Sequence, residues 1–317
     1  MKHIAKLSAL SALSLLFSTT ALAKPKTFAE IAEDPAKVAK QVWFGPDHAS
    51  FKNVGQVGAP PRIGLLSFYL LDTGTYKFNA MAAVYGPTYM NLSTGQTYRK
   101  AGESFGLTDQ AANIFATELA EIAVPKLKEV FAANGMELLT PLEFIKTEEQ
   151  KAAYISFELP ETGFQKFTAG ALKILDKNPH ANAAADGFLM IPTHIFSGNR
   201  DALAALESLR QQLGLDAFVV VVNNSATDKK NVAYLGTQML FYGPNPDPLP
   251  DNKMQAKYWT AMIPYPSGTY GKGFKGISIY DLKNETKPSY DGFDVVIGAI
   301  AGESIAKMNK AIEKSKR

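Results

Sequence analysis

Cysteine is absent from the 317 residues of the chain. Without cysteine the protein has no disulfide bonds, so its stability has to come from a buried hydrophobic core. The absence also excludes zinc sites built on thiolates, cysteine nucleophiles and a lipid attached through a cysteine. A chain of this length can bury a large core, either as one domain or as two smaller ones.

Long hydrophobic runs are absent beyond residue 23, where no segment approaches the roughly 18 apolar residues that a transmembrane helix needs. The start of the chain has the pattern of an export signal. Lys2 and Lys6 make it basic, residues 4–22 are mostly apolar, and residues 21–23 form a small-x-small cleavage site. The serines and threonines of this stretch argue against an uncleaved membrane anchor. We expect cleavage after Ala23 and a periplasmic or secreted protein.

The net charge is also small, and histidine is rare. The formal net charge is only +3, and no basic stripe is interleaved with aromatic residues, so the sequence does not predict nucleic-acid binding. His48, His180 and His194 show neither an HExxH motif nor a helical i, i+4 spacing. We expect these histidines to be structural, and we predict no metal site and no cofactor.

Catalytic motifs are found only in spacing and without their usual context. GESFG (102–106) matches GxSxG, but it lies at the end of the loop or hairpin predicted at 90–106 and not in a strand-to-helix turn, and there is no Walker loop. GTYGKGFKG (268–276) contains the GxGxxG spacing at 271–276, but it lies between two predicted strands and does not open a helix, so a hairpin turn explains its glycines. The sequence therefore favours a protein that is not an enzyme.

The pattern over residues 187–224 organises the rest of the chain. Two apolar runs, 187–196 and 217–222, flank an amphipathic stretch, and the second run has no polar residue, which is typical of a strand buried on both faces. Asp201 lies in the first turn of the predicted helix, and Gly214 ends it. The leucines that share one face of this helix are Leu203, Leu206, Leu209 and Leu213. The pattern predicts a β-α-β unit whose two strands belong to one sheet.

The same patterns predict the remaining elements. Strands are predicted at 63–71, 136–139, 232–242, 257–264 and 276–282, and the last two are predicted to pair as a hairpin. Helices are predicted at 109–134, 142–153, 163–176 and 301–314. Pro125 predicts either a kink in the first of these helices or two helices end to end. Residues 72–108 and 140–186 are two inserts, and the first of them includes a loop or hairpin at 90–106.

This order of elements predicts an α/β (α+β) fold. We expect a mixed sheet with parallel β-α-β units at the front, antiparallel strands at the back and helices packed on it. No convincing linker divides the chain. We therefore expect a signal peptide at 1–23, an N-terminal extension at 24–62 that wraps the domain edge, and a single elaborated domain at 63–317.

Four segments resemble a group of exported bacterial proteins in their layout. They are IGLLSF (63–68), DQAANIFATELAEIAV (109–124), GLDAFVVVV (214–222) and GISIYDL (276–282). In this layout the chain is similar to the periplasmic α/β domain shared by the curli secretion channel subunit, the TolB N-terminal domain and the penicillin-binding-protein activator lipoproteins. It departs from them in the missing lipid-carrying cysteine and the two inserts. The resemblance implies an assembly or regulatory partner at the cell envelope, with no catalytic residues.

Two sets of residues are candidate sites. Ligands of open α/β sheets bind beyond the carboxyl ends of strands, near helix N-termini. This rule predicts a crevice for a small anion at Ser197, Gly198, Asn199, Arg200, Asn223, Asn224 and Ser225. Ordinary capping and turn chemistry is the alternative explanation for these residues. The aromatic residues that are suited to anchor a protein partner are Tyr258, Trp259, Tyr265, Tyr270 and Phe274. The alternative is that these rings simply cover the sheet.

Three hypotheses of function follow. The first is a non-enzymatic exported protein that binds a protein partner in envelope assembly or secretion. The second is a periplasmic protein that binds a small anion in the predicted crevice. The third is a hydrolase without a recognisable motif.

Overall fold

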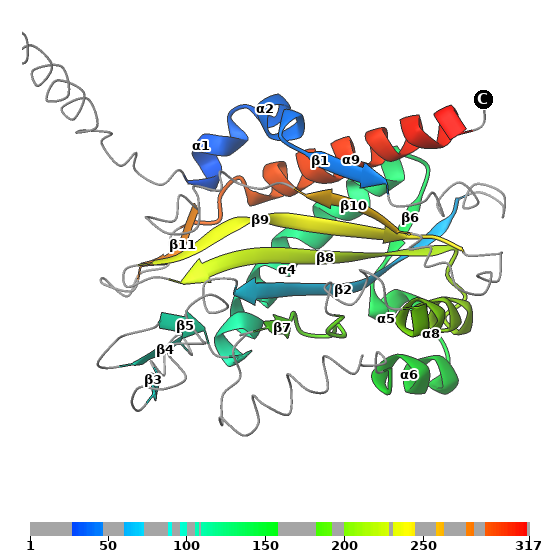
Figure 1. Ribbon diagram of the computed structural model, residues 1–317, viewed down its shortest axis with the longest axis horizontal. Helices are drawn as coiled ribbons and strands as arrows, with labels where there is room; N and C mark the ends of the chain where they lie inside the picture. Colours follow the sequence, from blue (N-terminus) through cyan, green and yellow to red (C-terminus); the bar gives the residue numbers. More distant parts are fainter. Residues whose placement is uncertain are drawn as a thin grey trace, which may run out of the picture.

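The fold is built on a mixed sheet that carries helices on both faces (Figure 1). The computed structural model describes residues 27–46, 60–72, 88–90, 96–99, 105–107, 109–157, 182–191, 200–227, 231–244, 258–262, 277–281 and 289–315. In this part of the chain the main sheet has eight strands, ordered β1-β10-β9-β8-β2-β6, with β7 paired to β2 and β11 paired to β9. The predicted α/β fold class is therefore confirmed.

The strands of the main sheet are β1 (Trp43–Pro46), β2 (Arg62–Asp72), β6 (Glu137–Leu139), β7 (Asn182–Ala184), β8 (Ala217–Thr227), β9 (Asn231–Tyr242), β10 (Tyr258–Met262) and β11 (Ile277–Asp281). A second sheet consists of β3 (Thr88–Met90), β4 (Gln96–Arg99) and β5 (Phe105–Leu107). The helices are α1 (Phe28–Ala32), α2 (Pro35–Lys40), α4 (Asp109–Ala133), α5 (Pro141–Phe144), α6 (Glu148–Ile155), α8 (Arg200–Gln212) and α9 (Phe293–Ser315).

The centre of the sheet is the parallel pair of β2 and β8, which are buried on both faces. On β8, Val219 and Val221 belong to one hydrophobic cluster, whereas Val220 belongs to the cluster on the opposite face. This arrangement explains why the strand has a continuous apolar run, because neither of its faces meets water. The strands predicted at 63–71 and 217–222 are both confirmed.

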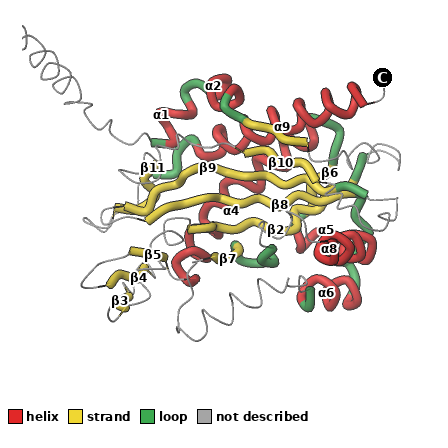
Figure 2. The backbone as a smooth tube through the Cα atoms, in the orientation of Figure 1, coloured by secondary structure: helices red, strands yellow, loops and turns green. Residues whose placement is uncertain are grey.

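Helices cover the two faces in separate groups (Figure 2). The long helices α4 and α9 pack on one face together with α1 and α2, and contribute side chains such as Phe115 and Ile297 to its cluster. The opposite face is covered by α5, α6 and α8, through residues that include Phe144 and Leu209. No described helix is long and apolar enough to cross a membrane.

The antiparallel half of the sheet is organised by β9. One side of β9 pairs with β8, while its other side pairs with β10 over residues 238–242 and with β11 over residues 231–234. The two strands predicted at 257–264 and 276–282 therefore exist, but the predicted pairing between them as a hairpin is wrong. They share β9 as a partner because β9 is long enough to hold both end to end.

Helices α4 and α8 each end beside a glycine. Gly214 has a φ of 63° at the end of α8, and Gly135 has a φ of 72° at the end of α4, a left-handed conformation that favours glycine. At the end of α8, the Leu215 N–H donates to the Arg210 carbonyl and the Gly214 N–H donates to the Gln211 carbonyl. This pair of bonds is the Schellman motif. Pro125 lies inside α4, which is a single helix and not two.

The first strand of the predicted β-α-β unit is not formed where it was expected. Residues 187–191 carry no strand, and residues 192–196 lie outside the described part. The parallel neighbour of β8 is β2 instead. Residues 189–191 reach β2, where side chains take the place of a strand ladder. The Tyr154 hydroxyl donates to the Leu66 carbonyl at 2.8 Å and accepts from the Leu189 N–H at 2.7 Å, so a side chain stands between the two backbones.

The position of this hydroxyl follows from a bulge in β2. The register with β8 shifts between Leu65 and Ser67, so Leu66 is an extra residue on β2. Its carbonyl is left for Tyr154, while Ser67 accepts from the Ile191 N–H at 3.3 Å through its own hydroxyl. The chain after β7 is thus tied to β2 through two side chains and not through a strand ladder.

The N-terminal extension joins the main core. Pro35 separates two short helices, as its position in the sequence predicts, and Asp34 caps the second of them. Phe28 is fully buried, with its ring centroid 5.2 Å from that of Tyr234 and 5.0 Å from that of Phe293. The extension therefore does more than wrap the domain edge, since its apolar residues complete the cluster under α9.

The remaining elements follow the predictions where the structure describes them. Segment 90–106 contributes to the antiparallel β3-β4-β5 sheet, which confirms the hairpin reading. The helix predicted at 142–153 is divided into α5 and α6, and the helix predicted at 301–314 begins earlier, at Phe293, as part of α9. The helix predicted at 163–176 lies outside the described residues.

We expect Tyr154→Phe to destabilise the protein. The substitution leaves the buried Leu66 carbonyl and the Leu189 N–H without their partner, at a cost of about 1–3 kcal/mol in the free energy of unfolding. Urea unfolding followed by circular dichroism measures the change. The control is Ser156→Ala, which removes an exposed hydroxyl bonded to the Ala152 carbonyl at the end of the same helix. Equal stabilities of the two variants would show that the Tyr154 hydroxyl does not secure this edge.

Candidate functional site

The predicted site residues on β8 lie within the strand, close to its carboxyl end. Asn223 is opposite Leu70 of β2, and Ser225 is opposite Asp72. Asn223 and Ser225 are fully buried, whereas Asn224, which alternates with them, is partly exposed. The Ser225 hydroxyl donates to the Leu71 carbonyl at 3.3 Å. The carboxyl ends of two parallel strands are thus adjacent, as the crevice rule requires, but the polar residues belong to the ladder and not to a loop beyond it.

Asn223 begins a short chain of buried hydrogen bonds. Thr237, its register partner on β9, donates through its hydroxyl to Asn223 Oδ1 at 2.7 Å. The Thr237 hydroxyl also lies 2.6 Å from the Tyr234 hydroxyl. All three residues have a relative exposure of 0%. They form a polar cluster inside the hydrophobic layer beneath α4 and α9.

A β-bulge brings Tyr234 and Thr237 to the same face of β9. The register shifts between Asn224 and Ser225 of β8, so that Asn224 is opposite Gly236 while Ser225 is opposite Tyr234. Leu235 is the extra residue, and Gly236 adopts a φ of 138° that few other residues tolerate. Sequence analysis missed both polar residues. The signal that could have found them is the single glycine inside the strand pattern VAYLGTQMLFY, which indicates a bulge.

One donor of this cluster has no partner. Asn223 Nδ2 is buried and makes no hydrogen bond within the described structure. Rotating the amide by half a turn gives Thr237 an N–H donor but leaves Oδ1 unpaired, so one end of the amide is unsatisfied in either orientation. An unpaired buried amide group costs about 1–3 kcal/mol. The unpaired amide therefore lies enclosed in the hydrophobic layer near the carboxyl end of β8.

The other half of the predicted crevice is not brought to this cluster. Arg200 is the first residue of α8, and Ser197, Gly198 and Asn199 lie outside the described residues. Figure 1 draws α8 beside the amino ends of β2 and β8, whereas their carboxyl ends lie at the opposite side of the picture. The N-terminus of α8 therefore does not lie beside Asn223, Asn224 and Ser225.

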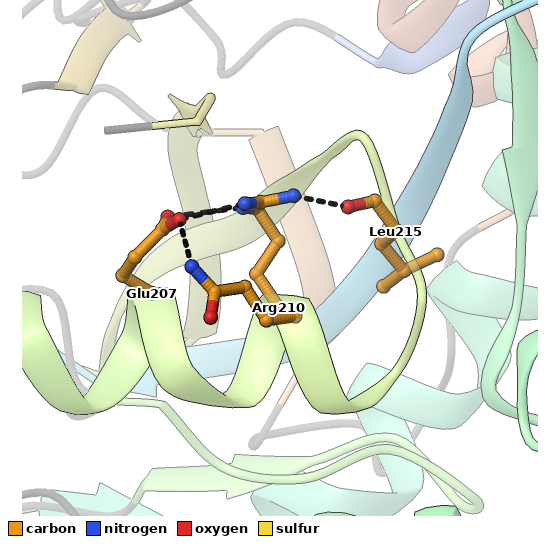
Figure 3. A network of polar contacts seen from close by, with 4 residues as sticks. Glu207, Arg210 and Leu215 are labelled. Atoms are coloured by element: carbon orange, nitrogen blue, oxygen red, sulfur yellow. Dashed lines mark hydrogen bonds and ion pairs between the residues drawn. The ribbon is translucent and has the colours of Figure 1, made fainter. Parts of the chain in front are cut away.

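The largely buried ion pair of the described chain lies on α8 and supports its C-terminal end (Figure 3). The Arg210 guanidinium donates to both oxygens of Glu207, at 2.9 Å and 2.6 Å, and to the Leu215 carbonyl. The exposed fractions of the two side chains are 13% for Arg210 and 15% for Glu207. These bonds fix the turn from α8 into β8, which is a structural role and gives the pair no free group for catalysis.

The tyrosines beside these contacts stay protonated at neutral pH. Burial raises the pKa of Tyr242 well above its ordinary value, and the carboxylate of Glu207 adds to the effect. Burial likewise raises the pKa of Tyr154, although its hydrogen bond with Leu189 opposes the shift. Neither phenol is therefore poised to act as a base.

The predicted aromatic set is only partly described. Tyr258 and Trp259 belong to β10, and Tyr265, Tyr270 and Phe274 lie outside the described residues. β10 is not the outermost strand of the sheet, because β1 pairs with it on its outer side. Trp259 is opposite Pro46 of β1 and Phe241 of β9.

A metal centre is not formed by the residues that the structure describes. Their His, Asp and Glu side chains include no group of three or more that could hold an ion. His48, His180 and His194 all lie in the parts that are not described.

Comparison of this chain with protein-family models, with curated proteins and with solved structures found no match. The inferences about function therefore depend on the sequence patterns and on the geometry above.

The unsatisfied amide predicts opposite effects for two substitutions in the same hydrogen-bond chain. Thr237→Val leaves both ends of the Asn223 amide unpaired, and we expect it to lower the free energy of unfolding by about 1–3 kcal/mol. Asn223→Val removes the unpaired group and places a β-branched residue in the strand, so we expect no loss or a small gain. Urea unfolding of both variants tests this. A large loss for Asn223→Val would indicate that the amide is satisfied in the native protein.

Proposed function

We propose that this protein is exported and binds a protein partner in envelope assembly or secretion, without catalysing a reaction. The proposal is supported by the export signal expected at 1–23 and by the resemblance in layout to envelope assembly proteins that the sequence suggests. It places the binding surface at the β1–β10 edge of the sheet.

The observation that carries the proposal is the position of the two tryptophans of the chain. Trp43 lies in β1 and Trp259 lies in β10, so both occupy the two outermost strands on one side of the sheet. Tyr258 and Phe44 are in the same two strands. Tryptophan and tyrosine are enriched among the residues that contribute most to protein–protein binding. The nine residues of β1 and β10 include these four aromatic residues, which favours a partner at this edge.

A pull-down from an envelope extract of the source organism tests the proposal. We expect the unaltered chain to capture one stoichiometric partner, and we expect Trp259→Ala to reduce the captured amount at least tenfold. Truncating an interface tryptophan costs about 2 kcal/mol or more, which corresponds to this loss.

The matched control is Leu142→Ala. Leu142 on α5 is 89% exposed, so its removal costs little stability, and α5 lies away from the β1–β10 edge (Figure 1). Thermal unfolding of every variant shows that the fold is kept. Capture of the partner by Trp259→Ala at the level of Leu142→Ala would refute the proposed surface, and the absence of any stoichiometric partner would refute the function.

The second candidate is a protein that binds a small anion. The unpaired Asn223 amide at the carboxyl ends of β2 and β8 favours it, because an amide N–H can donate to an anion. Phosphate at a hundred times its Kd would stabilise the fold by about 2.7 kcal/mol, which raises the Tm by several degrees.

A thermal-shift series with phosphate tests this candidate. For the crevice predicted from the sequence, we expect phosphate to raise the Tm of the unaltered chain and not of Arg200→Ala. A shift that survives in Arg200→Ala but disappears in Asn223→Ala would locate the anion at the carboxyl ends of the strands without α8. If phosphate leaves the Tm of the unaltered chain unchanged, this candidate is refuted for that anion.

A further inference from the structure

The outermost strand, β1, has a sequence that is unfavourable for a strand, although it lies next to a strand that pairs well. It has only four residues, Trp43–Pro46, and pairs antiparallel with β10. Gly45 weakens a strand because it has no side chain to pack, and Pro46 has no N–H to donate to a ladder. The neighbouring β10 has the sequence YWTAM, which is rich in strand-forming residues and contains neither glycine nor proline. The edge of β10 is therefore a better template than the segment that occupies it.

The attachment of β1 allows it to leave the sheet by itself. Directly before it, Val42 is 3% exposed, and its carbonyl accepts a hydrogen bond from Lys307 of α9. Phe28 is buried against Tyr234 and Phe293, which holds α1 on the domain. Loss of the β1–β10 pairing therefore costs the pairing of four residues and the contacts of β1 with α9, while the buried side chains of Phe28, Val38 and Val42 keep α1 and α2 in place.

We propose that β1 is a displaceable strap, and that an extended segment of a protein partner replaces it by pairing antiparallel with Tyr258–Met262 of β10. The inference rests on the proposed partner-binding function and specifies its mode. β1 itself demonstrates that this edge accepts an extended chain in a defined register. Strand addition of this kind takes its affinity from main-chain hydrogen bonds and its specificity from alternate side chains.

The strap also covers the outer side of an aromatic strand that would otherwise be an exposed edge. An uncovered strand of this composition would be a template for aggregation, and native proteins cover such edges with short or proline-containing segments. A tethered strap competes at a local concentration on the order of millimolar, so a free segment binds well only if it pairs better than β1 does. Only a segment that pairs with β10 more strongly than β1 does can therefore bind.

The absence of cysteine makes a direct test possible. Phe44 and Ala261 are register partners, as are Gly45 and Thr260, and successive antiparallel pairs alternate between the wide and the narrow spacing. The double variants Phe44→Cys/Ala261→Cys and Gly45→Cys/Thr260→Cys are made in the full chain, and the pair that oxidises completely is used. Its disulfide locks β1 onto β10, and the reduced form of the same variant is the matched control.

The probe is a fluorescein-labelled synthetic peptide with the sequence of residues 41–48 and the change Pro46→Thr. We expect it to bind the reduced variant and the unaltered chain with equal Kd, and not to bind the oxidised variant. The substitution Phe44→Pro weakens the strap in the full chain, and we expect it to lower the Kd at least tenfold. Equal binding to the oxidised and reduced forms, or no binding to the Phe44→Pro variant, would overturn the inference.

Hydrogen exchange keeps the test decisive if Phe44→Pro fails to fold. We expect the amides of Tyr258–Met262 to exchange at least tenfold faster in the reduced variant than in the oxidised one, because the strap opens locally. Equal exchange would overturn the inference. Neither measurement needs an envelope partner, so a failed pull-down with a positive peptide result would reject the proposed function and keep the strap.

Discussion

The pairing of β2 with β8 divides the hydrophobic interior into two layers. Because both strands are buried on both faces, each needs helices above and below, and the chain supplies α4 and α9 on one side and α5, α6 and α8 on the other. A bulge at Leu66 sets the alternation of β2 against β8. Side chains before and after that residue can then face the correct layer.

The amino ends of this pair are held by one compact turn. The carboxylate of Asp216 accepts from the Arg62 N–H at 2.7 Å, and the Arg62 guanidinium donates to the Gly214 carbonyl at 2.8 Å. Gln150 of α6 donates to the Leu213 carbonyl from the other side. The carbonyls of Leu213 and Gly214, at the C-terminal end of α8, thus accept hydrogen bonds from α6 and β2. These bonds join the start of both strands to two helices on the same face.

The carboxyl ends and the outer edge are organised differently. The buried polar chain of Asn223, Thr237 and Tyr234 lies near the carboxyl end of β8, and one amide end in it remains unpaired. At the edge, β1 covers β10 with four residues. In the proposed partner binding, the amino-end turn and the two hydrophobic layers would serve as the rigid scaffold, and the β1–β10 edge would be the locally weak surface.

The sequence alone determined the elements whose signals are local. The valines of 217–222 predict a strand buried on both faces, the spacing of Leu206, Leu209 and Leu213 predicts the buried face of α8, and Gly135 and Gly214 mark helix ends by their freedom of φ. These features depend only on neighbouring residues, so they can be inferred without knowing the rest of the fold.

Tertiary structure decided every pairing between distant segments. β8 has β2 as its parallel neighbour, and residues 187–191 are held at β2 by the Tyr154 hydroxyl, which is 35 residues from Leu189 in the sequence. Asn223 was recognised as polar, but its partner Thr237 is reached only through the register of β9 and the bulge at Gly236. Hydrogen-bond geometry across strands is set by register, and register depends on the packing of the whole sheet.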